Sequence, residues 1–114
     1  MANQSDRPEI LLIDDQPANL DVLCRLLERA GYAISVANNG RRGIEVAQKS
    51  QPALVLLDVV MPEMDGYQVC RNLKADGETA HIPVIFITGR NRETDLLAGF
   101  TAGGVDYIAK PIQE

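Results

Sequence analysis

Acidic, hydroxyl and basic side chains lie where short apolar segments of the sequence end. Asp14 and Asp15 follow one such segment and Asp58 follows another, while Thr88 and Lys110 come directly after two more. The carboxyl ends of parallel strands meet at one edge of a sheet, where ligands bind in open α/β folds. If these segments are parallel strands, the five side chains share one rim.

Their chemistry points to a divalent cation and a phosphoryl group. Three carboxylates brought together repel one another unless a cation neutralises them, although any single aspartate can equally be a loop or cap residue. Oxygen ligands without a nearby cysteine or histidine favour Mg²⁺, with Asp15 and Asp58 as direct ligands and Asp14 acting through water. Lys110 and Thr88 supply a cation and a hydroxyl that suit phosphoryl oxygens. These residues predict a phosphoryl-transfer site with an aspartate nucleophile.

The elements that must position these residues alternate between strand and helix. Strands are predicted over 9–13, 32–37, 53–57, 82–87 and 105–109, and helices over 17–30, 40–50, 65–76 and 92–102. Each strand is separated from the next by a crossover of helical length, which predicts an α/β fold with a parallel sheet. Asp65 with Gln68 forms a capping-box pattern, Gly77 is placed just past the end of that helix, and Gly66 is interpreted only as permitting a tight helix start.

Composition and charge exclude several classes of protein. A chain of 114 residues with 46% hydrophobic and 24% charged residues fits one globular domain. Its longest apolar run, Ala53 to Leu57, is far below the ~20 residues of a membrane span, and we expect a cytoplasmic protein. A net charge of −5 opposes direct binding of nucleic acid. Cys24 and Cys70 lack zinc-ligand or disulfide spacing and are predicted to be core residues.

Four separated motifs together resemble one family, the receiver domain of two-component response regulators. They are Asp14-Asp15, the segment Leu57-Asp-Val-Val-Met-Pro-Glu-Met-Asp-Gly66, Thr88-Gly89, and Asp106-Tyr-Ile-Ala-Lys-Pro111. The resemblance covers residues 9–112 and keeps the order and spacing of the motifs. It implies a flavodoxin-like, doubly wound, five-stranded parallel sheet with strand order 2-1-3-4-5.

The resemblance also implies a role for each matching residue. Asp58 is the implied phosphoacceptor, and Mg²⁺ is held by Asp14, Asp15, Asp58 and the backbone carbonyl of Val60. Phosphoryl oxygens are bound by Thr88, Gly89 and Lys110, and Thr88 forms a switch pair with Tyr107. The segment between that pair contains four glycines, Gly89, Gly99, Gly103 and Gly104, so we expect its helix to be easily repositioned on phosphorylation.

In the family's pattern the phosphoryl donor is the phosphohistidine of a sensor histidine kinase or a phosphotransfer protein. The domain is then not an enzyme but a phosphoacceptor that assists its own phosphorylation and dephosphorylation. One alternative is a phosphatase of the haloacid-dehalogenase type, but that class needs an acid two residues after the nucleophile, where this chain has Val60 or Gln16. Another alternative is a pseudo-receiver that binds partners without being phosphorylated.

The carboxyl end departs from the family's pattern. A receiver normally continues through a fifth helix after its Lys-Pro, whereas the sequence stops at Glu114. We therefore expect a polar tail over residues 1–8 and a receiver domain over 9–114 that is truncated, with its fifth helix largely missing. An output domain would follow in a longer natural chain. The sheet face without its helix would be open to self-association.

Overall fold

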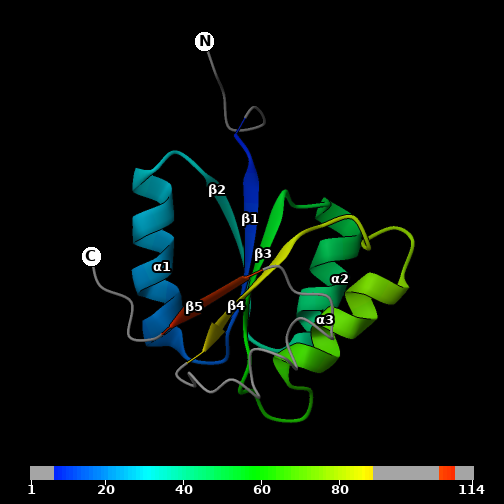
Figure 1. Cartoon of the computed structure of the whole chain (residues 1–114). Helices are drawn as coiled ribbons and strands as arrows, with labels where there is room; N and C mark the ends of the chain where they lie inside the picture. The colour runs from blue at the N-terminus through cyan, green and yellow to red at the C-terminus, as the bar shows by residue number, and fades with distance from the viewer. Residues whose placement is uncertain (1–6, 89–105, 110–114) are drawn as a thin grey trace.

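The computed structural model describes residues 7–88 and 106–109, and within them five parallel strands form one sheet (Figure 1). The strand order is β2-β1-β3-β4-β5, as the resemblance implied. The strands are β1 (Glu9–Ile13), β2 (Ala33–Ala37), β3 (Leu54–Asp58), β4 (Val84–Thr88) and β5 (Asp106–Ala109). The strand order reverses beside β1, which places a ligand-binding crevice at the carboxyl ends of β1 and β3.

Three helices lie within the described residues, and they cover both faces of the sheet. They are α1 (Pro17–Arg29), α2 (Gly40–Ser50) and α3 (Gly66–Ala75). Figure 1 shows α1 on one side of the sheet and α2 with α3 on the other. The helix expected over 92–102, and the expected shortage of a fifth helix after Lys110, lie outside the described residues. No helix in the described part of the chain is long and apolar enough to cross a membrane.

The central strands are apolar on both faces because each face carries its own core. On the α2 and α3 side, Leu11, Leu57 and Phe86 are fully buried. On the α1 side, Ile10, Leu12, Leu56 and Ile87 pack around Leu23 of α1. Successive side chains of a strand point to opposite faces, so unbroken apolar runs such as 54–57 serve both layers.

Both cysteines pack as predicted. Cys70 is fully buried in the core beneath α3, and Cys24 is partly buried against the core beneath α1. Burial raises the pKa of both thiols above the ordinary value, and for Cys24 the neighbouring Glu28 adds to the rise. Both side chains therefore act as small apolar groups and not as reactive thiolates.

The helix ends confirm the predicted capping box of α3 and show a glycine cap at the end of α1. The left-handed Gly31, with φ 97°, ends α1, and Tyr32 N–H donates to Leu27 O at 3.1 Å, which is the Schellman arrangement. At the start of α3, both hydrogen bonds of the predicted capping box are present between Asp65 and Gln68.

Gly77 lies just past the end of α3, as predicted, but it does not cap the helix in a left-handed conformation. The helix α3 ends at Ala75 with Asp76 in an extended conformation, and Gly31 is the only left-handed glycine among the residues that the structure describes. Polar side chains hold the turn that follows the helix. Asp76 accepts a hydrogen bond from Glu78 N–H at 2.9 Å, and Lys74 Nζ donates to the carbonyls of Ala80 and Ile82 at 3.1 and 2.6 Å.

Candidate functional site

Strand register brings the predicted aspartates together. Ile13 of β1 pairs with Leu57 of β3, so the residues that follow each of them emerge at the same edge of the sheet. One carboxylate oxygen from each of Asp14, Asp15 and Asp58 lies within 4.8 Å of the other two. Asp14 is 1% exposed and Asp58 is 3% exposed, while Asp15 is half-buried. We call these three residues the acidic cluster.

The backbone holds the acidic cluster in place. Asp14 N–H donates to Ala37 O of β2 at 3.1 Å, and Gln16 N–H donates to Asp14 Oδ1 at 2.9 Å. Asp15 Oδ1 is buried and accepts no hydrogen bond from any residue that the structure describes. Two unit charges about 4.8 Å apart repel by roughly 3 kcal/mol at an effective dielectric of about 20. A buried cluster with that repulsion and an uncommitted oxygen fits a divalent cation.

The backbone of Val59, the residue after the predicted phosphoacceptor, is held by hydrogen bonds from two sides. Val59 N–H donates to Ile87 O of β4 at 3.2 Å, and Gly66 N–H at the start of α3 donates to Val59 O at 2.8 Å. The next residue is Val60, whose carbonyl is the implied metal ligand. Val60 is 55% exposed. Strand β4 and the first residue of α3 therefore both hold the chain directly after Asp58.

The remaining predicted site residues are placed by the backbone alone. Thr88 ends β4 and pairs with Ala109 of β5, which immediately precedes Lys110, and Tyr107 pairs with Phe86. The Thr88 and Tyr107 side chains, and all of Gly89 and Lys110, lie outside the described atoms. Strand pairing thus supports a shared rim for Thr88 and Lys110, while the switch pair stays a prediction.

The loop between β3 and α3 has a conformation that the sequence did not predict. Met64 N–H donates to Pro62 O at 2.7 Å, which closes a three-residue turn around Glu63, and Glu63 has φ 69°. Such γ-turns with a left-handed central residue are rare and strained. Met61 is buried and Met64 is partly buried against the core, so both methionines pack the loop onto the domain. No pattern signalled the turn, because a glutamate is not a residue that favours positive φ.

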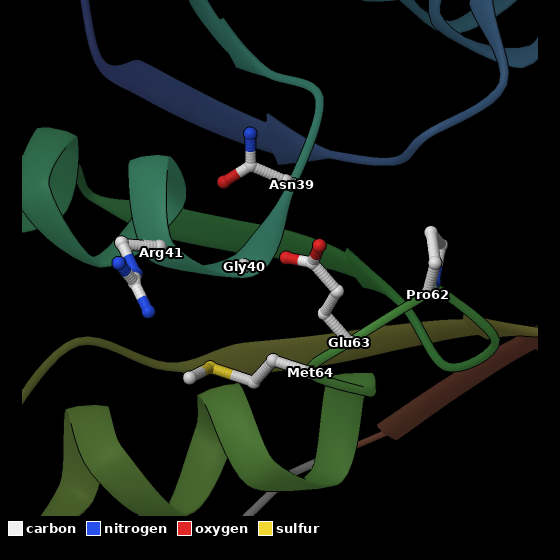
Figure 2. A pocket seen from close by; sticks show the side chains of 6 residues that line it. All are labelled: Asn39, Gly40, Arg41, Pro62, Glu63 and Met64. Carbon is white, nitrogen blue, oxygen red and sulfur yellow. The ribbon is translucent and has the colours of Figure 1, made fainter.

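The hollows of the surface near this loop are separate from the acidic cluster. One of about 90 Å³ lies between the start of α2 and the loop, and its lining comprises Asn39, Gly40, Arg41, Pro62, Glu63 and Met64. Figure 2 shows the Glu63 carboxylate directed toward the start of α2. A second hollow, of about 220 Å³, is formed by residues that follow Asp58 in the sequence. Its lining comprises Val59, Val60, Met61, Asp65 and Tyr67. The three residues of the acidic cluster line neither of them.

The geometry agrees with comparisons to known proteins. Residues 10–114 match the family of response regulator receiver domains. This chain belongs to that family. The receiver is 41% identical over 105 residues to the protein PilH of Pseudomonas aeruginosa, covering 92% of this chain and 87% of PilH. It is 30% identical to the receiver domain of a sensor histidine kinase from the same species, solved with magnesium coordinated in its active-site cleft, with a TM-score of 0.86 and coverage of 94% and 88%.

Other relatives are much longer than this receiver. The DNA-binding transcriptional regulator RpaA of Synechocystis is 42% identical over 104 residues, which cover 91% of this chain but 43% of RpaA. The receiver spans 23% of the response regulator PleD of Caulobacter vibrioides. It is a phosphoacceptor receiver module of two-component signalling, and in such relatives this module is one part of a larger chain.

Proposed function

We propose that this receiver accepts a phosphoryl group on Asp58 in a reaction that depends on Mg²⁺. The observation that carries the proposal is the acidic cluster, in which oxygens of Asp14, Asp15 and Asp58 lie within 4.8 Å of one another at the carboxyl edge of the sheet. A structural role would not explain why buried like charges are kept so close. Asp14, Asp15, Asp58 and the Val60 carbonyl would hold the cation, which when bound neutralises charge on the carboxylates and on the phosphoryl oxygens.

Asp58 would act as the nucleophile. One of its carboxylate oxygens forms a bond to phosphorus while the bond between phosphorus and the donor imidazole nitrogen breaks, and the bonding electrons stay on that nitrogen. The two hydrogen bonds of Val59 hold the chain directly after Asp58 and would help to orient its carboxylate for in-line attack. Lys110, Thr88 and Gly89 would bind the phosphoryl oxygens from the neighbouring strand ends. Thr88 and Tyr107 would then form the switch that reports the phosphoryl group to a partner.

The partners follow from the same proposal. A sensor histidine kinase or a phosphotransfer protein would supply the phosphoryl group, and an output domain in a longer chain would receive the signal in the cytoplasm. We propose residues 9–114 as the receiver domain, with residues 1–8 as a polar tail. The receiver would assist only its own phosphorylation and dephosphorylation and would not be an enzyme for external substrates.

The direct experiment is phosphorylation by a small donor. Incubation with acetyl phosphate and Mg²⁺ should add one phosphoryl group, detected by intact mass, and hydroxylamine should remove it. Asp58→Asn should abolish the adduct. Asp65→Asn is the matched control, because it removes a nearby carboxylate that caps α3 and does not belong to the acidic cluster. A wild-type chain that gains no adduct would contradict the proposal.

The alternatives have distinct outcomes in the same experiment. Release of phosphate from a phosphomonoester with turnover would favour a phosphatase. Partner binding that is unchanged by Asp58→Asn, together with no adduct, would favour a pseudo-receiver. The apolar Val60, two residues after Asp58, offers no group that could act as the acid that a phosphatase needs.

A further inference from the structure

We propose that Gly66 is a positioning residue for the phosphoacceptor, an inference that rests on the proposed function. Gly66 is buried at the first position of α3, and a methyl group built on its Cα would lie 2.2 Å from the carbonyl oxygen of Asp58. The same methyl group would lie 2.9 Å from Val59 Cα. Both atoms belong to the backbone, which cannot rotate away as a flexible side chain could. A side chain at position 66 must therefore move the start of α3 or the end of β3.

Either movement changes the site. Gly66 N–H donates to Val59 O at 2.8 Å, so separating α3 from β3 breaks the hydrogen bond that fixes the residue after Asp58. The loop from Val60 to Asp65 connects β3 to α3, so the Val60 carbonyl would move when these two elements separate. Displacing the groups that orient a metal ligand typically lowers metal affinity by about 10- to 100-fold. The absence of a side chain at position 66 thus sets the position of the Asp58 carboxylate and the Val60 carbonyl.

Gly40 provides a matched control in the same protein. It is also the buried first residue of a helix, α2, and it also follows a capping residue, Asn39, whose side chain accepts a hydrogen bond from Arg42 N–H. A methyl group on Gly40 would lie 2.6 Å from Val69 Cγ2 and 3.2 Å from Met64 Sδ, which are side-chain atoms. Alanine at position 40 therefore crowds the side chains of Val69 and Met64, whereas alanine at position 66 crowds the backbone of Asp58.

The test compares Mg²⁺ binding by Gly66→Ala and Gly40→Ala in isothermal titration calorimetry. We expect Gly66→Ala to raise the Mg²⁺ dissociation constant by about tenfold or more. Gly40→Ala should change it by less than about twofold, even if the two variants lose similar stability. In the metal-free proteins, the backbone amide resonances of Asp58 and Val59 should move in Gly66→Ala and stay in place in Gly40→Ala. Equal Mg²⁺ affinity in the two variants would overturn the inference.

A second pair of variants covers the case in which Gly66→Ala does not fold. Asp65→Ala removes the cap that seats α3, and Asn39→Ala removes the corresponding cap of α2. We expect weaker Mg²⁺ binding in Asp65→Ala than in Asn39→Ala. Asp65→Asn can still cap the helix, so it distinguishes the effect of losing the cap from the effect of losing the negative charge. Equal binding in Asp65→Ala and Asn39→Ala would again overturn the inference. A wild-type receiver that binds no Mg²⁺ would instead overturn the proposed function.

Discussion

The two ends of the parallel sheet use polar side chains in opposite ways. Near the amino end of β4, Lys74 donates to two carbonyls, and the buried Thr79 hydroxyl donates to Leu73 O at 2.7 Å. At the carboxyl end of β1 and β3, three carboxylates lie within 4.8 Å of one another, and Asp15 Oδ1 accepts no hydrogen bond from the described residues. The first arrangement satisfies polar groups, and the second leaves charges close together.

This difference separates stability from function. Hydrogen bonds that pair buried groups favour the folded state, whereas repulsion between clustered like charges opposes it. Removing a polar side chain at the amino end should therefore destabilise the protein without affecting ligands. Removing a carboxylate at the other end should stabilise the protein and abolish ligand binding.

The largest expected effect is at the carboxyl end. In buffer without Mg²⁺, Asp58→Asn should raise the free energy of unfolding by about 2 kcal/mol, because it removes repulsion from Asp14 and Asp15 while preserving the shape of the side chain. Urea unfolding followed by circular dichroism measures the change. Asp65→Asn should change the free energy by less than about 0.5 kcal/mol. If Asp58→Asn were less stable than the wild type, the proposed difference between the two ends of the sheet would be wrong.

Lys74 should give the next largest effect, with the opposite sign. Lys74→Met removes the donor to the carbonyls of Ala80 and Ile82 and should lower the free energy of unfolding by about 1 to 2 kcal/mol. Lys49→Met is the control, because Lys49 is an exposed lysine in the last turn of α2. Calorimetric titration should show the same Mg²⁺ affinity in Lys74→Met as in the wild type. A large loss of Mg²⁺ affinity would show that the two ends are not independent.

A smaller loss is expected at Thr79. Thr79→Val keeps the shape of the side chain but leaves Leu73 O without its donor, which should cost about 1 kcal/mol in urea unfolding. Ser50→Ala serves for comparison, since the Ser50 hydroxyl makes a similar bond to Val46 O at an exposed position. Equal changes in the two variants would argue that burial contributes nothing at Thr79.

The smallest expected effect depends on pH. Hydrogen bonds from Glu78 N–H and then from the Gln48 side chain lower the pKa of Asp76 below its ordinary value of 3.8. A lowered pKa in the folded state means that ionised Asp76 stabilises the fold above pH 3.8 and that this contribution disappears as pH falls through the lowered value. The stability difference between wild type and Asp76→Asn should therefore shrink on acidification. A difference that grows at low pH would contradict the assignment.

Much of this organisation could be predicted from the sequence because it depends on local patterns. Apolar runs that end on Asp14 and Asp58 marked the strands and their functional edge, and the Asp65 pattern marked the start of α3. The close approach of Gly66 to Asp58 could not be predicted, because it is set by how α3 docks on the sheet. The interpretation of Gly66 as only a helix-start residue was too narrow for this reason.

The same distinction explains the other differences. Gly77 lies just past the end of α3, as its local pattern predicts, but the turn there is held by hydrogen bonds that join the side chains of Asp76 and Lys74 to residues further along the chain. The turn around Glu63 depends on the loop being closed between β3 and α3. Local signals located the elements, and contacts between elements determined how the site is shaped.

The central claim is that Asp58 is the residue that takes the phosphoryl group. Phosphorylation with acetyl phosphate and Mg²⁺, followed by reduction of the acyl phosphate with borohydride, converts the modified aspartate to homoserine, which tandem mass spectrometry locates in the sequence. We predict homoserine at position 58, and no homoserine when Mg²⁺ is removed by a chelator. Homoserine at Asp14 or Asp15, or at no position, would contradict the account.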